Sequence, residues 1–345
     1  MKRLIPLLIF ICLLTSVFSD TEMNKLPIVY SRYYDIKLFG IEKFHPFETS
    51  KYSKVYKYLQ SELDLKPGNF YSPQKIDLKD LCKIHSQEYL DSLNKSDNIA
   101  RIAELGLLNK FPPSVLKKKL LNPHLYAVSG TLLAANLALE YGWAINLSGG
   151  YHHAKYSSGG GFCYFADVPY AVVSLREKKP GIKVLIIDLD AHQGNGFESW
   201  FGEDPNIFFF DVFNAEIYPK DTEAKKFIDF PFPVKSKIKD EEYLHILNEN
   251  LPKVISEVKP DIIFYIAGTD IYEHDSLGNL SITQEGIIKR DAFVFESALN
   301  QKVPIVMLLG GGYHKESSGI IGRSIVNLLS GTVLSRDIKK EFLGK

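Results

Sequence analysis

Apolar runs recur along this chain and alternate with segments of helical pattern. The runs are nearly continuous and rich in β-branched residues, so polar positions do not interrupt them at every second residue. Such runs are typical of parallel strands that are covered on both faces. The predicted strands span residues 28–30, 144–147, 182–187, 207–210, 262–266 and 303–309.

Helical patterns fill the intervals between these runs. The predicted helices span residues 122–141, 168–177, 240–258, 283–299 and 319–329. Gly142 follows the first and Pro180-Gly181 the second, as expected of helix ends. Because strands and helices alternate, we expect an α/β fold with a parallel sheet and right-handed crossovers. No internal repeat or long linker divides the chain, so a single domain is expected over residues 20–345.

Residues 1–19 have the pattern of a secretory signal peptide. Lys2-Arg3 precedes an apolar stretch from Leu4 to Leu14, and Ser19 is a small residue at the expected cleavage site. The stretch is short for a membrane span, so we expect no transmembrane segment after cleavage. A functional signal predicts a secreted or periplasmic protein. The alternatives are an uncleaved anchor and a mis-assigned start codon; without export the protein would be cytoplasmic or nuclear.

The charges of the chain balance. Lys plus Arg and Asp plus Glu number 41 each, and no patch interleaves basic with aromatic residues. A protein that holds nucleic acid needs a basic surface. Direct binding of nucleic acid is therefore not expected.

The side chains with chemical potential follow the predicted strands. In open α/β sheets, sites form beyond the carboxyl ends of the strands. Such positions are occupied by a pair of histidines, an Asp-x-Asp-x-His segment, a further aspartate and a tyrosine after three glycines: His152, His153, Asp188, Asp190, His192, Asp270 and Tyr313. We expect these residues to converge on one edge of the sheet.

Three of these residues can bind one metal ion. Asp190 and His192 alternate with Leu189 and Ala191, so in an extended segment they face the same side, about 7 Å apart. Taken alone, the pair could be a strand end that caps the next helix. With Asp270 it supplies three ligands and leaves a fourth position for water, as a catalytic zinc ion requires. Two carboxylates and one imidazole neutralise zinc and leave it Lewis-acidic.

The remaining polar residues match the needs of hydrolysis. His152 and His153 can take and return the proton of a water molecule, and the Tyr313 hydroxyl can stabilise an oxyanion. By strand parity, Asp188 could orient one imidazole, and Asn195 is the candidate partner of the other. For Asn195 the alternative is a turn residue with positive φ.

Two glycine-rich turns indicate close approach to a ligand. Gly310 to Gly312 precede Tyr313 and would let the backbone of this loop approach a bound ligand closely. Gly161 and Phe162 end a second glycine turn and are predicted to line a substrate channel, with Tyr218 as the opposite wall. Core packing is the alternative for both aromatic rings.

These motifs together resemble the zinc-dependent histone deacetylase family. The resemblance rests on residues 149–153, 159–164, 188–196, 267–270 and 310–315, and it covers roughly residues 27–332. Residues 30–31, 42–47, 142–146 and 211–214 resemble the class IV branch in particular. The resemblance implies the arginase/deacetylase fold, a single catalytic domain around an eight-stranded parallel sheet flanked by helices. It also implies hydrolysis of the amide on a lysine ε-nitrogen of an acylated protein or peptide.

The resemblance also implies roles for individual residues. It assigns zinc to the three ligands named above. His153 matches the general base and acid, His152 remains mainly electrostatic, and Tyr313 matches the oxyanion donor. Asp188 matches the partner of His152 and a residue of a structural potassium site, and Asn195 stands where many relatives have Asp. The class IV features imply that long fatty acyl groups are removed better than acetyl.

Three other functions compete with this interpretation. A binuclear-manganese ureohydrolase would need a carboxylate two positions after His192, where Gly194 stands, and another two positions from Asp270, where Gly268 and Tyr272 stand. A catalytically inactive reader of acyl-lysine would need only a pocket, without the histidine pair and the tyrosine. A deacetylase of small amines such as acetylpolyamines would differ in loop shape and rim charge, so it stays open.

Overall fold

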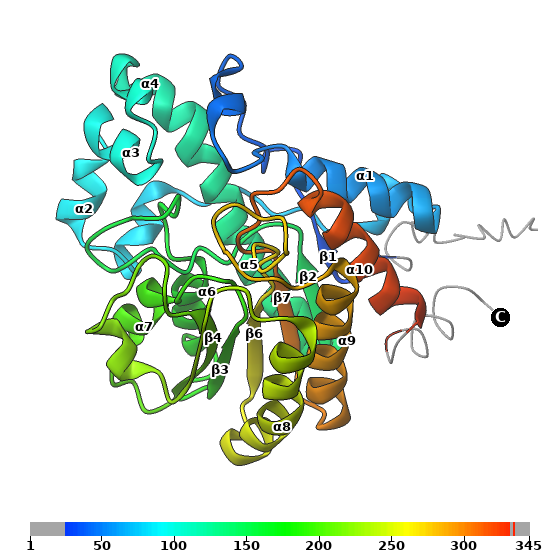
Figure 1. Ribbon diagram of the computed structural model, residues 1–345. Helices are drawn as coiled ribbons and strands as arrows, with labels where there is room; N and C mark the ends of the chain where they lie inside the picture. The colour runs from blue at the N-terminus through cyan, green and yellow to red at the C-terminus, as the bar shows by residue number, and fades with distance from the viewer. Residues whose placement is uncertain (1–24, 332–333, 335–345) are drawn as a thin grey trace, which may run out of the picture.

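A seven-stranded parallel sheet is the centre of the computed structural model, which describes residues 25–331 and Leu334 (Figure 1). The strands are β1 (Ile28–Val29), β2 (Trp143–Asn146), β3 (Val184–Asp188), β4 (Ile207–Asn214), β5 (Phe230–Val234), β6 (Ile262–Ile266) and β7 (Ile305–Leu308). Their order is β1-β2-β7-β6-β3-β4-β5, and each neighbouring pair is parallel. The six strands predicted from apolar runs are all present, which confirms the parallel α/β sheet.

The eight-stranded sheet implied by the resemblance is wrong for the described residues, which form seven strands. The pattern of apolar runs also missed β5. This strand contains Pro231 and Pro233, and only Val234 is buried. Proline cannot donate to a sheet ladder and is confined to edge strands. β5 is such an edge strand, since it pairs with β4 alone.

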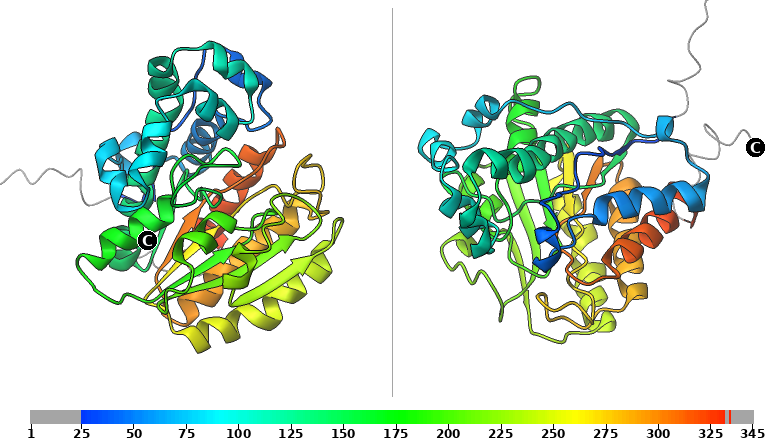
Figure 2. Two further views of the ribbon diagram at one scale, coloured as in Figure 1. Left: turned by 90° about the vertical axis from the view of Figure 1, so that its left-hand side faces the viewer. Right: turned by 90° about the horizontal axis from the view of Figure 1, so that it is seen from above.

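Helices cover both faces of the sheet. They are α1 (Lys51–Leu63), α2 (Gln87–Ser92), α3 (Ser96–Ile102), α4 (Pro113–Leu116), α5 (Asn122–Tyr141), α6 (Asp167–Arg176), α7 (Asn195–Phe201), α8 (Asp240–Val258), α9 (Gln284–Asn300) and α10 (Ser317–Gly331). Short 3-10 or π segments are Ile41–Phe44, Pro67–Asn69, Leu78–Lys83, Gly106–Lys110, Lys117–Leu121 and Ala224–Phe227. The row α8, α9, α10 and α1 lies on one side, and α5 packs against α6 on the other (Figures 1 and 2).

The predicted helix ends agree with the structure. α5 ends at Tyr141, and Gly142 follows with φ of 82°, a left-handed conformation that glycine adopts without strain. Thr283 caps α9, where its hydroxyl accepts a hydrogen bond from the backbone N–H of Gly286 at 3.0 Å. The helices between residues 51 and 116, and α7, were not predicted.

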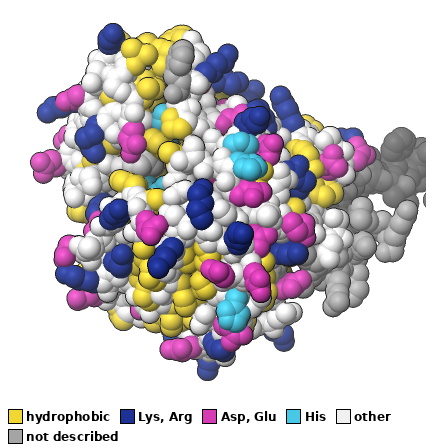
Figure 3. Space-filling model, viewed as in Figure 1, with side chains coloured by type: hydrophobic (Ala, Val, Ile, Leu, Met, Phe, Trp, Pro, Cys, Tyr) yellow, Lys and Arg dark blue, Asp and Glu magenta, His cyan; other side chains and the backbone are white. Residues whose placement is uncertain are grey.

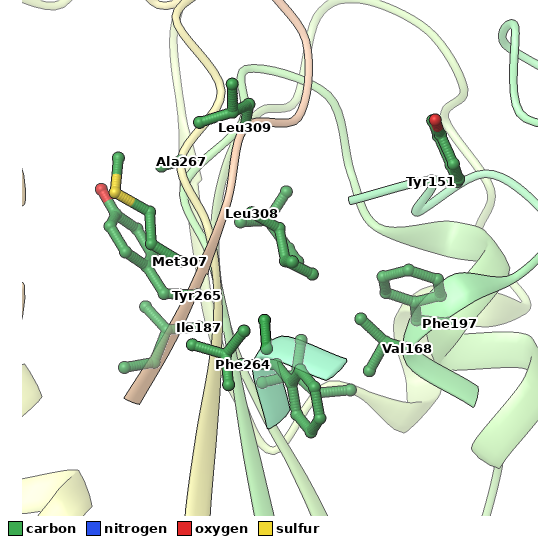
Figure 4. Close-up of a cluster of buried hydrophobic side chains, with 14 of the residues drawn as sticks. Tyr151, Val168, Ile187, Phe197, Phe264, Tyr265, Ala267, Met307, Leu308 and Leu309 are labelled. Carbon is green, nitrogen blue, oxygen red and sulfur yellow. The ribbon is translucent and has the colours of Figure 1, made fainter. Parts of the chain in front are cut away.

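The central strands bury side chains on both faces of the sheet. Figure 4 shows Phe264 and Leu308 on one side, and their neighbours Tyr265 and Met307 on the other. All four are buried, as expected when successive residues of a strand point to opposite, covered faces. Truncating Phe264 to alanine would cost about 3–5 kcal/mol of stability. This rigid sheet positions the loops that follow its strands.

The sheet brings the predicted site residues to one edge. Strands β2, β7, β6 and β3 are consecutive neighbours, and each is followed by one of the predicted polar segments. The described residues up to about 116 gather largely at one end of the molecule (Figure 2). The predicted signal peptide, residues 1–19, lies outside the described residues. Within the described part, no helix is long and apolar enough to cross a bilayer.

Candidate active site

Asp190, His192 and Asp270 form a buried group that could hold a metal ion. Their ligand atoms all lie within 4.8 Å of one another. The His192 Nδ1 atom lies 3.1 Å from Asp190 Oδ1 and 2.8 Å from Asp270 Oδ2. The residues follow β3 and β6, which are neighbours in the sheet. The structure thus places the three predicted ligands together.

The charge of this group favours a cation. Burial opposes a charge on His192, but hydrogen bonds and the charges of Asp190 and Asp270 outweigh burial and raise its pKa to about 10. Burial also raises the pKa of Asp270, to about 7, and the charge of Asp190 adds to this effect. Two buried carboxylates at such close range need a positive charge between them. A divalent metal would supply it.

Backbone groups hold the two carboxylates. The Gly311 N–H donates to Asp190 Oδ2 at 2.7 Å, and the Ala191 N–H donates to Asp270 Oδ1 at 2.9 Å. Each of these bonds joins the loops that follow two different strands. The carboxylates are therefore oriented by the strand-end loops themselves.

Arg290 ties the same loops together from within α9. Its fully buried guanidinium donates from Nη1 to the carbonyl oxygens of Leu189 at 3.1 Å and Gly268 at 2.6 Å. Its charge is balanced by Asp291, 2.9 Å away. This positive group fixes the backbone just before two of the candidate metal ligands, Asp190 and Asp270.

The histidine pair lies beside the metal group, and each imidazole has its own partner. His152 Nδ1 lies 2.8 Å from Asp188 Oδ2, and His153 Nδ1 lies 2.8 Å from Asn195 Oδ1. Their ring centroids are 4.1 Å apart. Asn195 is the first residue of α7, so it is not the positive-φ turn residue considered as the alternative.

The two imidazoles differ in charge. For His152, burial opposes protonation, but the charges of Asp188 and Asp190 outweigh burial and raise the pKa to about 9. For His153, burial and the neighbouring charges of His152 and His192 hold the pKa well below its usual value. His152 is therefore suited to carry a positive charge, and His153 to accept a proton.

Tyr313 lies over the metal group. Its ring centroid is 6.1 Å from that of His192, and its N–H donates to Asp275 Oδ2 at 2.7 Å. Burial, followed by the charges of Asp190 and Asp270, raises the pKa of the phenol well above its usual value. The hydroxyl therefore keeps its proton and can donate a hydrogen bond to an oxyanion.

The predicted channel residues surround the same point. The Phe162 ring lies 5.8 Å from that of Tyr313, and the Tyr218 ring lies 5.0 Å from that of His153. Gly161 has φ of +49°, and a Cβ there would lie 2.3 Å from His153 Cδ2. Neither aromatic ring is fully buried, and Tyr218 is 47% exposed, so core packing does not account for them.

A cavity of about 890 Å³, including the part open to solvent, leads away from these residues. His152, His153, Phe162 and Tyr313 line one region of it, whereas Tyr218, the predicted opposite wall, is not among its lining residues. Its other walls are largely apolar and include Ile36, Leu38, Leu105, Leu108 and Leu120. No strand or helix was predicted in the segments that form these walls, so the chamber could not be inferred from the pattern of the chain.

The chain is similar to known proteins over most of its length. Residues 45–329 match the histone deacetylase domain family. The chain is 43% identical over 318 residues to histone deacetylase 2 of Arabidopsis thaliana, which covers 91% of this chain and 81% of that protein. The chain belongs to the histone deacetylase family. It is 26% identical to histone deacetylase 8 of Xenopus tropicalis, over 83% of this chain and 79% of that protein. The solved HDA15 HD domain has the same fold, with a TM-score of 0.70, 16% identity and 90% coverage of both chains.

Two of the positions at which a two-metal ureohydrolase would need further carboxylates, Gly194 and Gly268, have no space for a side chain in this member of the deacetylase family. A Cβ at Gly268 would lie 2.3 Å from Asp190 Oδ2, and one at Gly194 would lie 2.5 Å from Asp188 Oδ2. The glycines thus allow the aspartates to approach the backbone closely. Both positions are closed to a side chain, which favours a single metal ion.

Some supporting residues of this hydrolase site were missed by sequence reasoning. Lys51 begins α1, is fully buried, and donates from Nζ to the carbonyl oxygens of Gly310 at 2.9 Å and Gly311 at 3.1 Å. Arg290 and Asp275 also come from other segments of the chain than the groups that they hold. A lysine within a helical pattern is normally an exposed residue, so only the tertiary structure reveals such a role.

Proposed function

We propose that this protein is a zinc-dependent amidohydrolase that removes acyl groups from lysine ε-amino groups of proteins or peptides. The observation that carries the proposal is the position of Asp190, His192 and Asp270 beside the histidine pair and beneath Tyr313. These residues offer a buried metal-ligand set, a proton acceptor and an oxyanion donor in one place. That combination meets the chemical needs of amide hydrolysis.

The donor set fits zinc. Two carboxylates and one imidazole are ligands that zinc accepts, and three protein ligands leave a position for water or substrate. When bound there, zinc would polarise the substrate carbonyl and acidify water. The potassium ion implied at Asp188 stays a prediction, to be tested by metal analysis.

The protein's own residues divide the remaining work. His153 takes a proton from the attacking water and returns it to the departing lysine amine. His152, paired with Asp188, contributes positive charge. The Tyr313 hydroxyl donates to the oxygen on which negative charge develops.

The acyl group that this site accepts is proposed to be a long fatty chain. The apolar cavity walls favour an aliphatic ligand, because burying each CH₂ group contributes about 0.8 kcal/mol. Membership of the class IV branch is part of the same proposal and rests on the resemblance at residues 30–31, 42–47, 142–146 and 211–214. Of these segments, residues 42–47 lie at the cavity. Glu42, His45 and Phe47 of that segment line the cavity.

Turnover of matched substrates tests this function. Acetyl-, octanoyl- and myristoyl-lysine peptides of one sequence would be compared with an acetylpolyamine, with bound metal quantified in the same sample. We expect kcat/KM to rise with chain length and about one zinc ion per chain. A preference for the acetylpolyamine would support the small-amine alternative, and no turnover of any acyl-lysine would contradict the proposal.

The cellular location is also a proposal. The basic start, apolar stretch and small residue at Ser19 support export of the mature chain from residue 20. Mass spectrometry of the native protein tests this, and we expect a new N-terminus at Asp20. An intact Met1 on a protein inside the cell would contradict export and leave intracellular acyl-lysines as substrates.

A further inference from the structure

A chain of hydrogen bonds behind His153 ends on a carboxylate from a distant loop. His153 Nδ1 lies 2.8 Å from Asn195 Oδ1, and Asn195 Nδ2 donates to Asp221 Oδ2 at 3.1 Å. Lys155 Nζ donates to the same Asp221 oxygen at 2.6 Å. The carboxylate of Asp221 is thus separated from the His153 imidazole by the Asn195 amide.

The order of donors and acceptors in this chain is fixed by Asp221. An ionised carboxylate only accepts hydrogen bonds, so it selects the NH₂ end of the Asn195 amide. Burial opposes this ionisation. The hydrogen bond from Lys155 and the bonds from the other donors together outweigh burial and lower the pKa of Asp221 to about 2. The oxygen of Asn195 must then face His153. An acceptor at Nδ1 requires a proton there, which leaves Nε2 of the neutral imidazole free to accept a proton.

We propose that Asp221 is a positioning residue that sets the tautomer of His153 through Asn195. The inference rests on the proposed function, because the free Nε2 is the atom that would act as the base. Without Asp221, the amide could turn and present its NH₂ group to Nδ1. That orientation favours the opposite tautomer, in which Nε2 carries the proton and cannot accept another.

The surroundings of Asp221 hold it in this position. Its Oδ1 accepts from the Ala224 N–H at 3.0 Å. Its backbone N–H donates to Gln193 Oε1 at 3.2 Å, and its carbonyl accepts from Gln193 Nε2 at 3.1 Å. Tyr218, three residues earlier, packs its ring against His153. The loop that orients the base therefore also contacts its imidazole ring directly.

An exchange of the two side chains tests the proposal. Asn195→Asp alone would set two carboxylates against each other, and Asp221→Asn alone would leave the amide without a fixed acceptor. Each single change should lower kcat by ~10- to 100-fold, as is usual for partners that orient a catalytic histidine, with a smaller change in KM. The double variant Asn195→Asp/Asp221→Asn restores one acceptor towards His153 and one amide behind it. It should recover most of the kcat lost by Asn195→Asp.

A second readout does not depend on activity. The nitrogen chemical shifts of ¹⁵N-labelled histidine report which ring nitrogen carries the proton. We expect the Nδ1–H form for His153 in the native protein and in the double variant, and a shift towards the Nε2–H form in Asp221→Asn. Glu223→Gln is the matched control, since Glu223 lies in the same segment but pairs at the surface with Lys226. It should change neither tautomer nor rate.

The outcomes separate this inference from the proposed function. An unchanged His153 tautomer in Asp221→Asn would overturn the inference even if the protein proves to be a deacylase. A double variant no better than Asn195→Asp, in a folded protein, would do the same. Tautomer changes as expected in a protein without acyl-lysine turnover would support the positioning role and contradict the proposed function.

Discussion

The buried Lys51 ammonium lies 2.9 Å from the carbonyl oxygen of Gly310, so α1 holds the turn that leads to Tyr313. Lys51→Met should leave two carbonyl oxygens without this donor and loosen the turn. We expect a loss of stability of ~1–3 kcal/mol, and a lower kcat. Urea unfolding and steady-state kinetics measure both. Lys54→Met is the control: Lys54 is on the same helix but half exposed and paired with Glu48, so an equal effect would contradict the anchoring role.

Tyr313→Phe should preserve the fold and the bound metal but lower kcat by ~10²–10³, the usual effect of removing one oxyanion donor. The ring contacts to Phe162 and His192 do not involve the hydroxyl, so KM should change little. Kinetics and metal analysis of one preparation provide the measurement. A nearly unchanged kcat would place Tyr313 outside the chemistry.

Gly161 and Gly160 offer a comparison of two neighbouring glycines. A methyl group at Gly161 would lie 2.3 Å from the His153 ring at a φ of +49°, so Gly161→Ala should displace the imidazole and abolish most activity. At Gly160 the nearest atom would be the Tyr218 hydroxyl, 3.3 Å away, without positive φ. Gly160→Ala should therefore retain activity. A near-native rate for Gly161→Ala would show that the position of His153 is not critical.

Metal binding should release protons. A histidine that binds a metal ion must be neutral. In the metal-free protein, however, the pKa of His192 is raised to about 10, because hydrogen bonds and charges from Asp190 and Asp270 outweigh burial. At pH 8 His192 is therefore protonated before zinc binds, and zinc affinity should rise with pH up to this pKa. Calorimetry in two buffers of different ionisation enthalpy should show at least one proton released per zinc ion. No release would contradict a ligand role for His192.

The sequence predicted the parts of this fold that have local patterns. Buried parallel strands are continuous apolar runs, so six strands were found, and the residues after them were placed at one edge. β5 was missed because its prolines argue against a strand, and it forms only by pairing with β4. Its identification depends on tertiary context that the local pattern does not contain.

Within the site, too, residues in local sequence motifs could be predicted, and residues that depend on tertiary contacts could not. Asp190, His192 and Asp270 follow strands in recognisable motifs, so their convergence could be predicted. Lys51 and Asp221 come from a helix and a loop far along the chain, and nothing in their neighbouring residues indicates the groups that they contact. The apolar chamber is equally non-local, because segments around Leu38 and Leu105 meet only in the folded protein.

Titration of metal-free protein with zinc tests the central claim, that one ion held by Asp190, His192 and Asp270 is required for hydrolysis. Acyl-lysine turnover should be absent without metal, rise in proportion to added zinc, and stop rising at one equivalent per chain. Asp270→Ala should bind no stoichiometric zinc and remain inactive throughout. Turnover in the metal-free protein, a break at two equivalents, or an Asp270→Ala protein that reaches native rates would contradict the account.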